Sequence, residues 1–379
     1  MEIYVVNVGD TVSAIANRFG VSVEQIIFDN QLVYPYLLAV GQALFINLGQ
    51  TAQEHTLEVN GYAYPFISPW VLEQTLPYLS NLLVFSYGFT SEGELVPPLW
   101  DDFPLIQAAQ RFNTAPILVL TPLGPDGRFN NLLISSIVNS ADAAANLIEN
   151  LVELMQTKGY RGIDIDFEYI LAGDRDAFTA FVRQVAETMR TYGYRTSVAL
   201  APKTSAEQTG LLYQGKDYPA LGEVADSVLI MTYEWGYTYG PPLAVAPINQ
   251  VRRVVEYAIT EIPPEKINLG IPNYGYDWPL PYEKGTTRAT TIGNIQAIQI
   301  ALTQGAEISY DELYQSPFYQ YIELNTDVEH EVWFEDVRSL RQKFQLIEEF
   351  GLRGCGYWQI MQLFRANWLL LSNLFFIEK

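Results

Sequence analysis

Between residues 57 and 360 the sequence alternates between short apolar segments and amphipathic ones, and this alternation limits the possible folds more than any other feature. Strands are predicted at eight places: 57–64, 82–87, 116–121, 162–168, 195–201, 227–233, 267–274 and 354–360. Helices are predicted near 71–80, 101–112, 137–158, 174–192, 217–225, 248–261, 336–350 and 363–376. Strands that alternate with helices pair in parallel, so eight such units predict an α/β fold, a closed (β/α)8 TIM barrel. A doubly wound open sheet is the alternative.

Two segments depart from this alternation. About 80 residues separate the last two strands, and residues 278–335 among them predict a small α+β insertion at the top of the barrel. The first 48 residues predict a separate β-α-α-β module, which a polar joint around 48–56 connects to the rest. We therefore expect one domain at 1–48 and a second at 54–379.

Composition excludes several classes of function. The formal net charge of −21 would repel the phosphates of nucleic acids and of anionic membranes, so neither is expected as a partner. No apolar run reaches the roughly 20 residues of a membrane span, and the N-terminus lacks the pattern of a signal peptide. One cysteine, Cys355, and two histidines far apart, His55 and His330, predict neither a disulfide nor a metal site. We expect no cofactor, and we expect a monomer.

The segment GIDIDFE, residues 162–168, places three carboxylates on one predicted strand. Side chains in a strand alternate between its two faces, so Asp164, Asp166 and Glu168 share one face and the apolar residues share the other. The apolar face packs under the helices, so the acids face the barrel interior and Glu168 lies at the carboxyl end, where this fold builds active sites. Burial and neighbouring charge raise the pKa of a carboxyl group, which predicts Glu168 as a general acid. Salt bridges beneath a loop are the alternative, but the sequence offers no convincing base.

Two other strand ends carry aromatic and polar side chains. LIMTYEWG ends the sixth strand with Tyr233, Glu234 and Trp235, and GCGYWQI ends the eighth with Trp358. Indole rings stack on the C–H faces of pyranose rings, and phenols bond to polar groups of sugars. Each aromatic residue alone is more typical of the core than of a site, but their shared position at the top of the barrel predicts a sugar site.

The first module resembles the LysM family over its whole length, from YVVNVGDTVSAIANRFGVSVEQIIFDN to VGQALFIN. That family binds N-acetylglucosamine-containing glycans, peptidoglycan or chitin, in a shallow groove between two loops. The resemblance implies a groove lined by Gly9, Asp10, Thr11 and the turn that begins at Asn30. For each of these residues, a purely structural role as a turn or a helix cap is the alternative.

The remainder resembles glycoside hydrolase family 18. RGIDIDFE matches the family motif D-G-x-D-x-D-x-E, with Arg161 in place of the first Asp, and MTYE resembles M-x-Y-D, with Glu234 in place of Asp. NGYAY on the first strand and YW on the eighth match aromatic positions of the family. The resemblance implies retaining hydrolysis in which the substrate's own 2-acetamido group is the nucleophile.

This resemblance also implies the roles of individual residues. Glu168 would be the acid and then the base, Asp166 would hold the acetamido N–H, and Asp164 would tune Asp166. Tyr233 would bond the acetamido oxygen, and Trp358 would form the floor under the sugar at subsite −1. The implied substrate-binding residues are Trp358, Tyr62, Glu234, Trp235 and Tyr274.

The chain resembles the spore-cortex fragment lytic N-acetylglucosaminidases in two respects. It pairs a LysM module with this barrel, and it contains the segments MTYEWGYTYGPPLAVAPI and HEVWFED. The resemblance implies a hydrolase of spore-cortex peptidoglycan, located in the coat or cortex of the spore and delivered there without a signal peptide. Two alternatives remain open: a chitinase or chito-oligosaccharide hydrolase, and a glycan-binding protein without catalysis.

Overall fold

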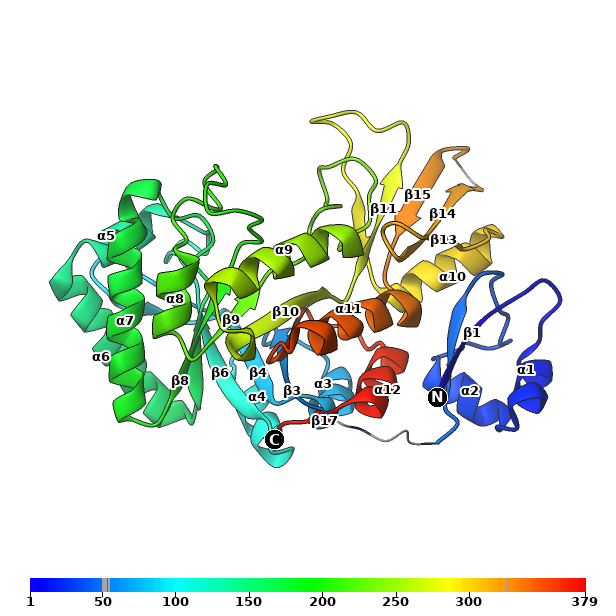
Figure 1. The fold of residues 1–379 in the computed structure, drawn as a ribbon, viewed down its shortest axis with the longest axis horizontal. Helices are drawn as coiled ribbons and strands as arrows, with labels where there is room; N and C mark the ends of the chain where they lie inside the picture. The colour runs from blue at the N-terminus through cyan, green and yellow to red at the C-terminus, as the bar shows by residue number, and fades with distance from the viewer. Residues whose placement is uncertain (50–52, 54, 325) are drawn as a thin grey trace.

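Eight parallel strands form a closed barrel in the computed structural model, which describes residues 1–379 except 50–52, 54 and 325 (Figure 1). In order around the barrel they are β3 (Thr56–Ala63), β4 (Asn81–Phe89), β6 (Ala115–Leu120), β7 (Gly162–Ile165), β8 (Arg195–Leu200), β9 (Ser227–Ile230), β10 (Ile267–Pro272) and β16 (Gly354–Trp358). The ring closes because β16 pairs in parallel with β3, where Gly354 faces Glu58. The predicted (β/α)8 barrel is confirmed, and the open sheet is excluded.

Helices cover the outside of the barrel. They are α3 (Pro69–Thr75), α4 (Phe103–Arg111), α5 (Leu132–Val138), α6 (Ala141–Lys158), α7 (Arg175–Thr191), α8 (Tyr218–Val224), α9 (Ile248–Glu261), α11 (Val337–Phe350) and α12 (Arg365–Leu374), with short 3-10 turns at Leu76–Tyr78, Ala172–Asp174 and Pro264–Lys266. The helix predicted near 137–158 is α6, which begins at Ala141 because Ser140 caps it by accepting a hydrogen bond from the Ala143 amide at 3.3 Å; the preceding α5 was not predicted. No helix in the described part of the chain is both long and apolar enough to cross a membrane.

The apolar face of β7 fixes the orientation of the acids. Ile163, Ile165 and Phe167 are fully buried in the main core. The Phe167 ring packs between two rings of α7, Phe178 at 5.8 Å and Phe181 at 6.1 Å. Since side chains alternate along the strand, the three acids are turned to the opposite side, toward the barrel interior.

A second sheet interrupts the barrel between β10 and β16. Its five antiparallel strands run in the order β12 (Thr290–Ile292), β11 (Gly275–Pro279), β15 (Glu329–Trp333), β14 (Ser316–Ile322) and β13 (Ser309–Asp311), and α10 (Asn294–Gln304) packs against it. This is the predicted α+β insertion, and its first strand begins at Gly275. In Figure 1 the sheet stands above α10 and α11. Two short strands pair alongside the barrel strands: β5 (Leu95–Val96) pairs antiparallel with β4, and β17 (Phe376–Ile377) pairs in parallel with β3.

The N-terminal module is a β-α-α-β unit. It contains β1 (Glu2–Val5), α1 (Val12–Phe19), α2 (Val23–Asp29) and β2 (Ala43–Ile46), and the two strands pair antiparallel. Thr11 caps α1 and Ser22 caps α2, each through a hydrogen bond from the amide three residues later. Gly20 ends α1 in the left-handed conformation, at a φ of 67°, as the sequence predicts.

Direct contacts fix this module to the barrel. Phe45 is 1% exposed and belongs to the core of the barrel rather than to the module's own core. The Ile308 amide donates to the Val40 carbonyl oxygen at 2.8 Å, and the Arg365 guanidinium lies 3.8 Å from the ring centroid of Phe28. The predicted joint at 48–56 lies partly outside the described residues.

Candidate active site

The acids of β7 and of the segment that follows it extend from the closed interior of the barrel into an open pocket. Asp164 is fully buried and accepts hydrogen bonds from the Ser197 hydroxyl at 2.5 Å and the Tyr62 hydroxyl at 2.8 Å. Asp166 is buried and Glu168 is half-buried, and both line a pocket of about 750 Å³. The structure therefore brings the three predicted acids into one continuous site.

Burial raises the pKa of each of these acids. For Asp164, burial is the largest effect, and its hydrogen bonds and the charge of Lys216 oppose it. Burial raises the pKa of Asp166 well above its ordinary range, and the charges of Glu168 and Asp164 raise it further. Burial also raises the pKa of Glu168, against the charge of Lys216 and with that of Glu234. A carboxyl group with a raised pKa retains its proton closer to neutral pH, as a general acid must.

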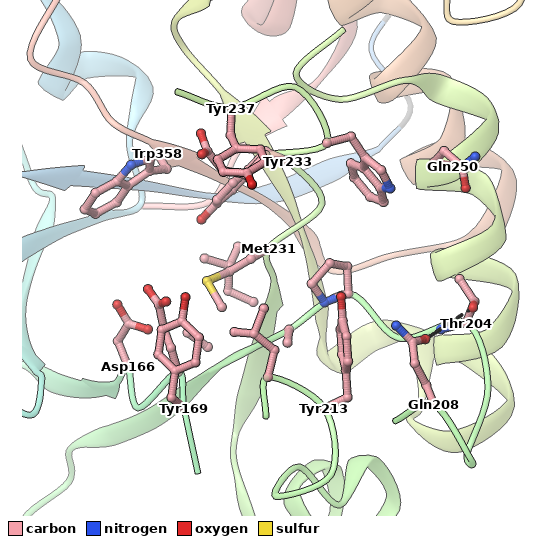
Figure 2. A pocket seen from close by; sticks show the side chains of 18 of the residues that line it. Asp166, Tyr169, Thr204, Gln208, Tyr213, Met231, Tyr233, Tyr237, Gln250 and Trp358 are labelled. Carbon is pink, nitrogen blue, oxygen red and sulfur yellow. Dashed lines mark hydrogen bonds between the residues drawn. The ribbon is translucent and has the colours of Figure 1, made fainter. Parts of the chain in front are cut away.

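One carboxylate oxygen of Asp166 is buried without a hydrogen-bond partner. This atom is Oδ1, and such atoms are rare because an unpaired buried acceptor costs about 1–3 kcal/mol. Figure 2 shows the carboxylate pointing into the pocket, toward the side where Trp358 lies. The site thus holds an acceptor that is ready for a donor from a ligand, such as an amide N–H.

Aromatic side chains form the wall opposite Asp166. Trp358 ends β16, and the ring of Tyr62 packs against it in an edge-on arrangement at 5.6 Å. Tyr233 lies near Trp358 on this side of the pocket (Figure 2). Burial, followed by the charges of Asp166 and Glu168, raises the pKa of Tyr233 well above its ordinary value. Its hydroxyl therefore stays protonated and can donate a hydrogen bond.

Glu234 is held by the insertion. Its φ of 68° lies in the left-handed region, which residues other than glycine seldom adopt. Its Oε1 accepts hydrogen bonds from the hydroxyls of Tyr274 and, at 2.9 Å, Tyr276. Glu234 and Trp235 line the pocket, as predicted for substrate contacts, whereas Tyr274 is buried and is not among the described lining residues. Tyr274 therefore contacts Glu234 rather than the described wall of the pocket, and its direct contact with substrate stays a prediction.

Many residues that line the pocket were not predicted from the sequence. The other lining residues include the polar and aromatic side chains of Tyr169, Thr204, Gln208, Tyr213, Tyr237, Gln250 and Arg253, together with the thioether of Met231. Figure 2 places Gln250, Thr204 and Gln208 at the end of the pocket away from Trp358 and Asp166. Met231 is the first residue of the MTYE segment and could have been found there. The loop residues belong to no motif or periodic pattern that would have indicated them.

Lys216 is the most important of the missed residues. It is 1% exposed, and its Nζ donates to the carbonyl oxygens of Phe167 and, at 2.9 Å, Ala199. The sequence predicts no base that reaches the barrel acids, and Lys216 corrects this prediction. Lys216 nevertheless bonds carbonyl oxygens, and within the described residues it forms no ion pair with a carboxylate. Its segment, QGKDY, spans the start of the helix predicted near 217–225. No periodic pattern there indicates whether the Lys216 side chain points toward the barrel interior or toward solvent.

Three of the four residues predicted to contact glycan in the LysM module make hydrogen bonds within the module itself. Thr11 caps α1, and Asp10 accepts hydrogen bonds from the hydroxyl of Tyr4 on β1 and from the Asn7 amide. Asn30 is buried, and its amide group exchanges hydrogen bonds with the backbone of Phe45 at 2.7 and 2.9 Å. Gly9 is exposed. The side chain of Asn30 therefore holds the module together and does not face a groove.

Comparisons with known proteins agree with this architecture. The family model described as Glycosyl hydrolases family 18 matches residues 81–362, and the LysM domain model matches 4–47. The Cortical fragment-lytic enzyme of Bacillus subtilis (strain 168) is 40% identical, over 100% of this chain and 99% of that protein. The crystal structure of the Bacillus cereus spore cortex-lytic enzyme SleL superposes with a TM-score of 0.94 at 32% identity, covering 99% of this chain and 98% of that one. A chitinase from Chromobacterium violaceum ATCC 12472, at 22% identity and a TM-score of 0.75, shares the fold.

Proposed function

Because this chain belongs to glycosyl hydrolase family 18, we propose that it hydrolyses N-acetylglucosaminyl bonds in the peptidoglycan of the spore cortex, with Glu168 as acid and base. The chain is a glycoside hydrolase that also carries a LysM module. Two relatives that match nearly the whole length of both chains, from Bacillus subtilis and Bacillus cereus, are cortex-lytic enzymes, and this supports both the substrate and a location in the spore.

The reaction proceeds in two steps. In the first, Glu168 donates its proton to the glycosidic oxygen while the carbonyl oxygen of the substrate's 2-acetamido group attacks C1. The bond from C1 to the leaving sugar breaks, and an oxazolinium ion forms on the sugar that remains. In the second step, water attacks C1, Glu168 takes a proton from it, and the ring of the oxazolinium opens. The configuration at C1 is retained.

The other two acids of this segment, together with Tyr233, position the acetamido group and stabilise its charge. Asp166 accepts the acetamido N–H through its unpaired Oδ1, and its charge stabilises the positive charge that develops on the oxazolinium. Asp164, anchored by Ser197 and Tyr62, raises the pKa of Asp166 and so tunes its charge. Tyr233 donates to the acetamido oxygen.

The observation that carries this proposal is the buried, unpaired oxygen of Asp166 beside the half-buried acid Glu168. A site for ordinary two-carboxylate hydrolysis would need a second free carboxylate across the pocket. Glu234 lines the pocket, but two tyrosine hydroxyls bond one of its oxygens. The substrate's own acetamido group is therefore the better nucleophile.

The proposal is tested by measuring the release of reducing ends from spore-cortex fragments and from chitin oligomers, with the wild type and Glu168→Gln. We expect the wild type to act on the cortex and to leave N-acetylglucosamine at the new reducing end. Loss of the general acid should lower turnover by about 10²–10⁴-fold while the variant still binds the glycan.

Three results would contradict the proposal. Faster cleavage of chitin oligomers would indicate a chitinase, and no cleavage of either polymer would indicate a glycan-binding protein. Equal rates on cortex fragments whose acetamido groups had been removed would exclude the substrate-assisted mechanism.

A further inference from the structure

Lys216 is a buried cation that the mechanism above does not use. It lies between β8 and α8, and its Nζ donates to the carbonyl oxygens of Phe167 and Ala199. Phe167 is the residue between Asp166 and Glu168. Regular pairing of β7 with β8 ends at Ile165, so the hydrogen bond from Lys216 holds the backbone of the irregular segment that carries both acids.

Carboxylates dominate the charged surroundings of Lys216. The charges of Asp166, Glu168 and Asp164, in this order of strength, favour its ammonium form. The other titratable or charged groups around Lys216 and Glu168 are Lys203 after β8, Arg175 and Asp217 at the starts of α7 and α8, Tyr169 and Tyr213 at the pocket, Tyr62 on β3, and Tyr233 and Glu234 after β9. Arg175 and Asp217 pair with each other at 2.5 Å.

Stability alone does not account for a charged side chain at this position. Burial lowers the pKa of Lys216 to about 8, although the three acids act in the opposite direction. The two carbonyl oxygens could be bonded by a neutral donor, whereas the desolvation of an ammonium group costs several kcal/mol. The feature that distinguishes this place in the barrel is the row of acids, whose negative charge Lys216 offsets.

We propose that Lys216 is a positioning residue for hydrolysis: its ammonium group holds the Asp166–Glu168 segment and sets the pH range in which Asp166 is ionised while Glu168 keeps its proton. This inference rests on the role proposed above for Glu168. Removal of a nearby positive charge makes the ionised form of a carboxyl group less stable, so both acids should then lose their protons at higher pH. The activity profile should move toward alkaline pH.

Three substitutions separate the charge from the hydrogen bonds. Lys216→Gln keeps a donor and removes the charge, Lys216→Met removes both, and Lys216→Arg keeps both. The matched control is Lys379→Met, since Lys379 also bonds two carbonyl oxygens, at 2.7 and 3.0 Å, and burial also lowers its pKa to about 8. Lys379 follows β17 beside the start of β3, at the opposite end of the barrel from the acids.

The first measurement needs no turnover. In protein labelled with ¹³C at glutamate carboxyls, the Glu168 resonance is the one that disappears in Glu168→Gln, and its titration midpoint is followed by NMR. We expect the midpoint to rise by about one pH unit or more in Lys216→Gln and Lys216→Met, since an opposite charge at close range shifts a pKa by about 1–3. It should stay at the wild-type value in Lys216→Arg and Lys379→Met.

The second measurement is the pH profile of kcat/KM, whose two limbs should move in the same direction as the NMR midpoint. A wild-type midpoint in Lys216→Gln, or a shift in Lys216→Arg as large as that in Lys216→Gln, would overturn the proposal. A lower rate in Lys216→Met with unchanged limbs would show that Lys216 acts only through its hydrogen bonds. If the wild type fails to hydrolyse cortex, the proposed function fails, and the NMR titration still decides the role of Lys216.

Discussion

The two ends of the barrel bury carboxylates in opposite ways. At the amino ends of the strands, Glu58 is 3% exposed and lies between two guanidinium groups, Arg353 at 2.7 Å and Arg195 at 3.0 Å. At the carboxyl ends, Asp166 has no ion-pair partner in the described structure. Its nearby cation, Lys216, is bonded to carbonyl oxygens.

The pKa values of the two acids differ accordingly. Burial would raise the pKa of Glu58, but the hydrogen bond and charge of Arg353, together with the charge of Arg195, lower it below its ordinary value. Burial raises the pKa of Asp166 well above its ordinary value, and Glu168 adds to this effect. This fold can supply counter-ions to a buried acid where only stability is required. The acids at the other end, which form no ion pair within the described residues, are therefore best explained by chemistry.

Among the substitutions that compare the two ends of the barrel, Asp166→Asn should have the largest effect. Replacement of the carboxylate by an amide of the same size removes the negative charge near the oxazolinium and turns one of the two acceptor oxygens into a donor, which weakens the pairing with the acetamido N–H. We expect turnover on cortex fragments to fall by about 10²–10³-fold, as for the loss of one electrostatic contact to a transition state. The thermal unfolding midpoint at neutral pH should rise, because a buried charge beside two other acids is removed.

The pH dependence of stability provides the control for this substitution. The pKa of Asp166 is raised in the folded protein from an ordinary value of 3.8, so between these two values the folded state binds more protons than the unfolded chain. Stability from this group therefore falls as pH rises above about 4 toward the folded pKa. Asp166→Asn should flatten this decrease. A variant that loses both activity and stability would show that Asp166 is a structural residue, as Glu58 is.

The converse substitution is Glu58→Gln, at the other end of the barrel. It removes the carboxylate that pairs with Arg195 and leaves Arg353 with only Glu378 among the described residues, at 3.6 Å. Loss of one partner from a buried ion pair destabilises a protein by about 3–5 kcal/mol, and the partial exposure of the arginines lowers this to about 2–4 kcal/mol. We expect the free energy of unfolding in urea to fall by this amount, while kcat/KM of the folded fraction stays close to the wild-type value. A loss of activity without a loss of stability would erase the distinction between the two ends.

The sequence contains enough information for the barrel and for the direction of the acid row. Both follow from local periodicity, because Ile163, Ile165 and Phe167 identify the outer face of β7, and the inner face must then carry the acids. The eightfold alternation of strands and helices fixes the topology in the same way. These features depend only on residues that are neighbours in the chain.

The missed features depend on residues that are distant in the chain. Lys216 lies about 50 residues beyond the acids in a segment without periodicity, and nothing local shows that its side chain turns inward. Phe45 belongs to the first predicted module by its place in the chain, yet it is buried in the core of the barrel. The LysM resemblance marks Asn30 as a groove residue, whereas the structure uses its amide to hold the backbone of Phe45.

The smallest expected effect distinguishes the two counter-ions of Glu58. The Arg195 side chain is 47% exposed and that of Arg353 is 21% exposed. Water screens the more exposed partner, so Arg195→Met should lower the free energy of unfolding by less than about 1 kcal/mol. Arg353 also donates the hydrogen bond that contributes most to the low pKa of Glu58, so Arg353→Met should cost about 2–3 kcal/mol. Urea unfolding of the two variants side by side checks the difference. Equal losses would mean that Glu58 needs both cations at once. The end of the barrel at the amino ends of the strands would then be stabilised by a three-residue cluster rather than by one dominant pair.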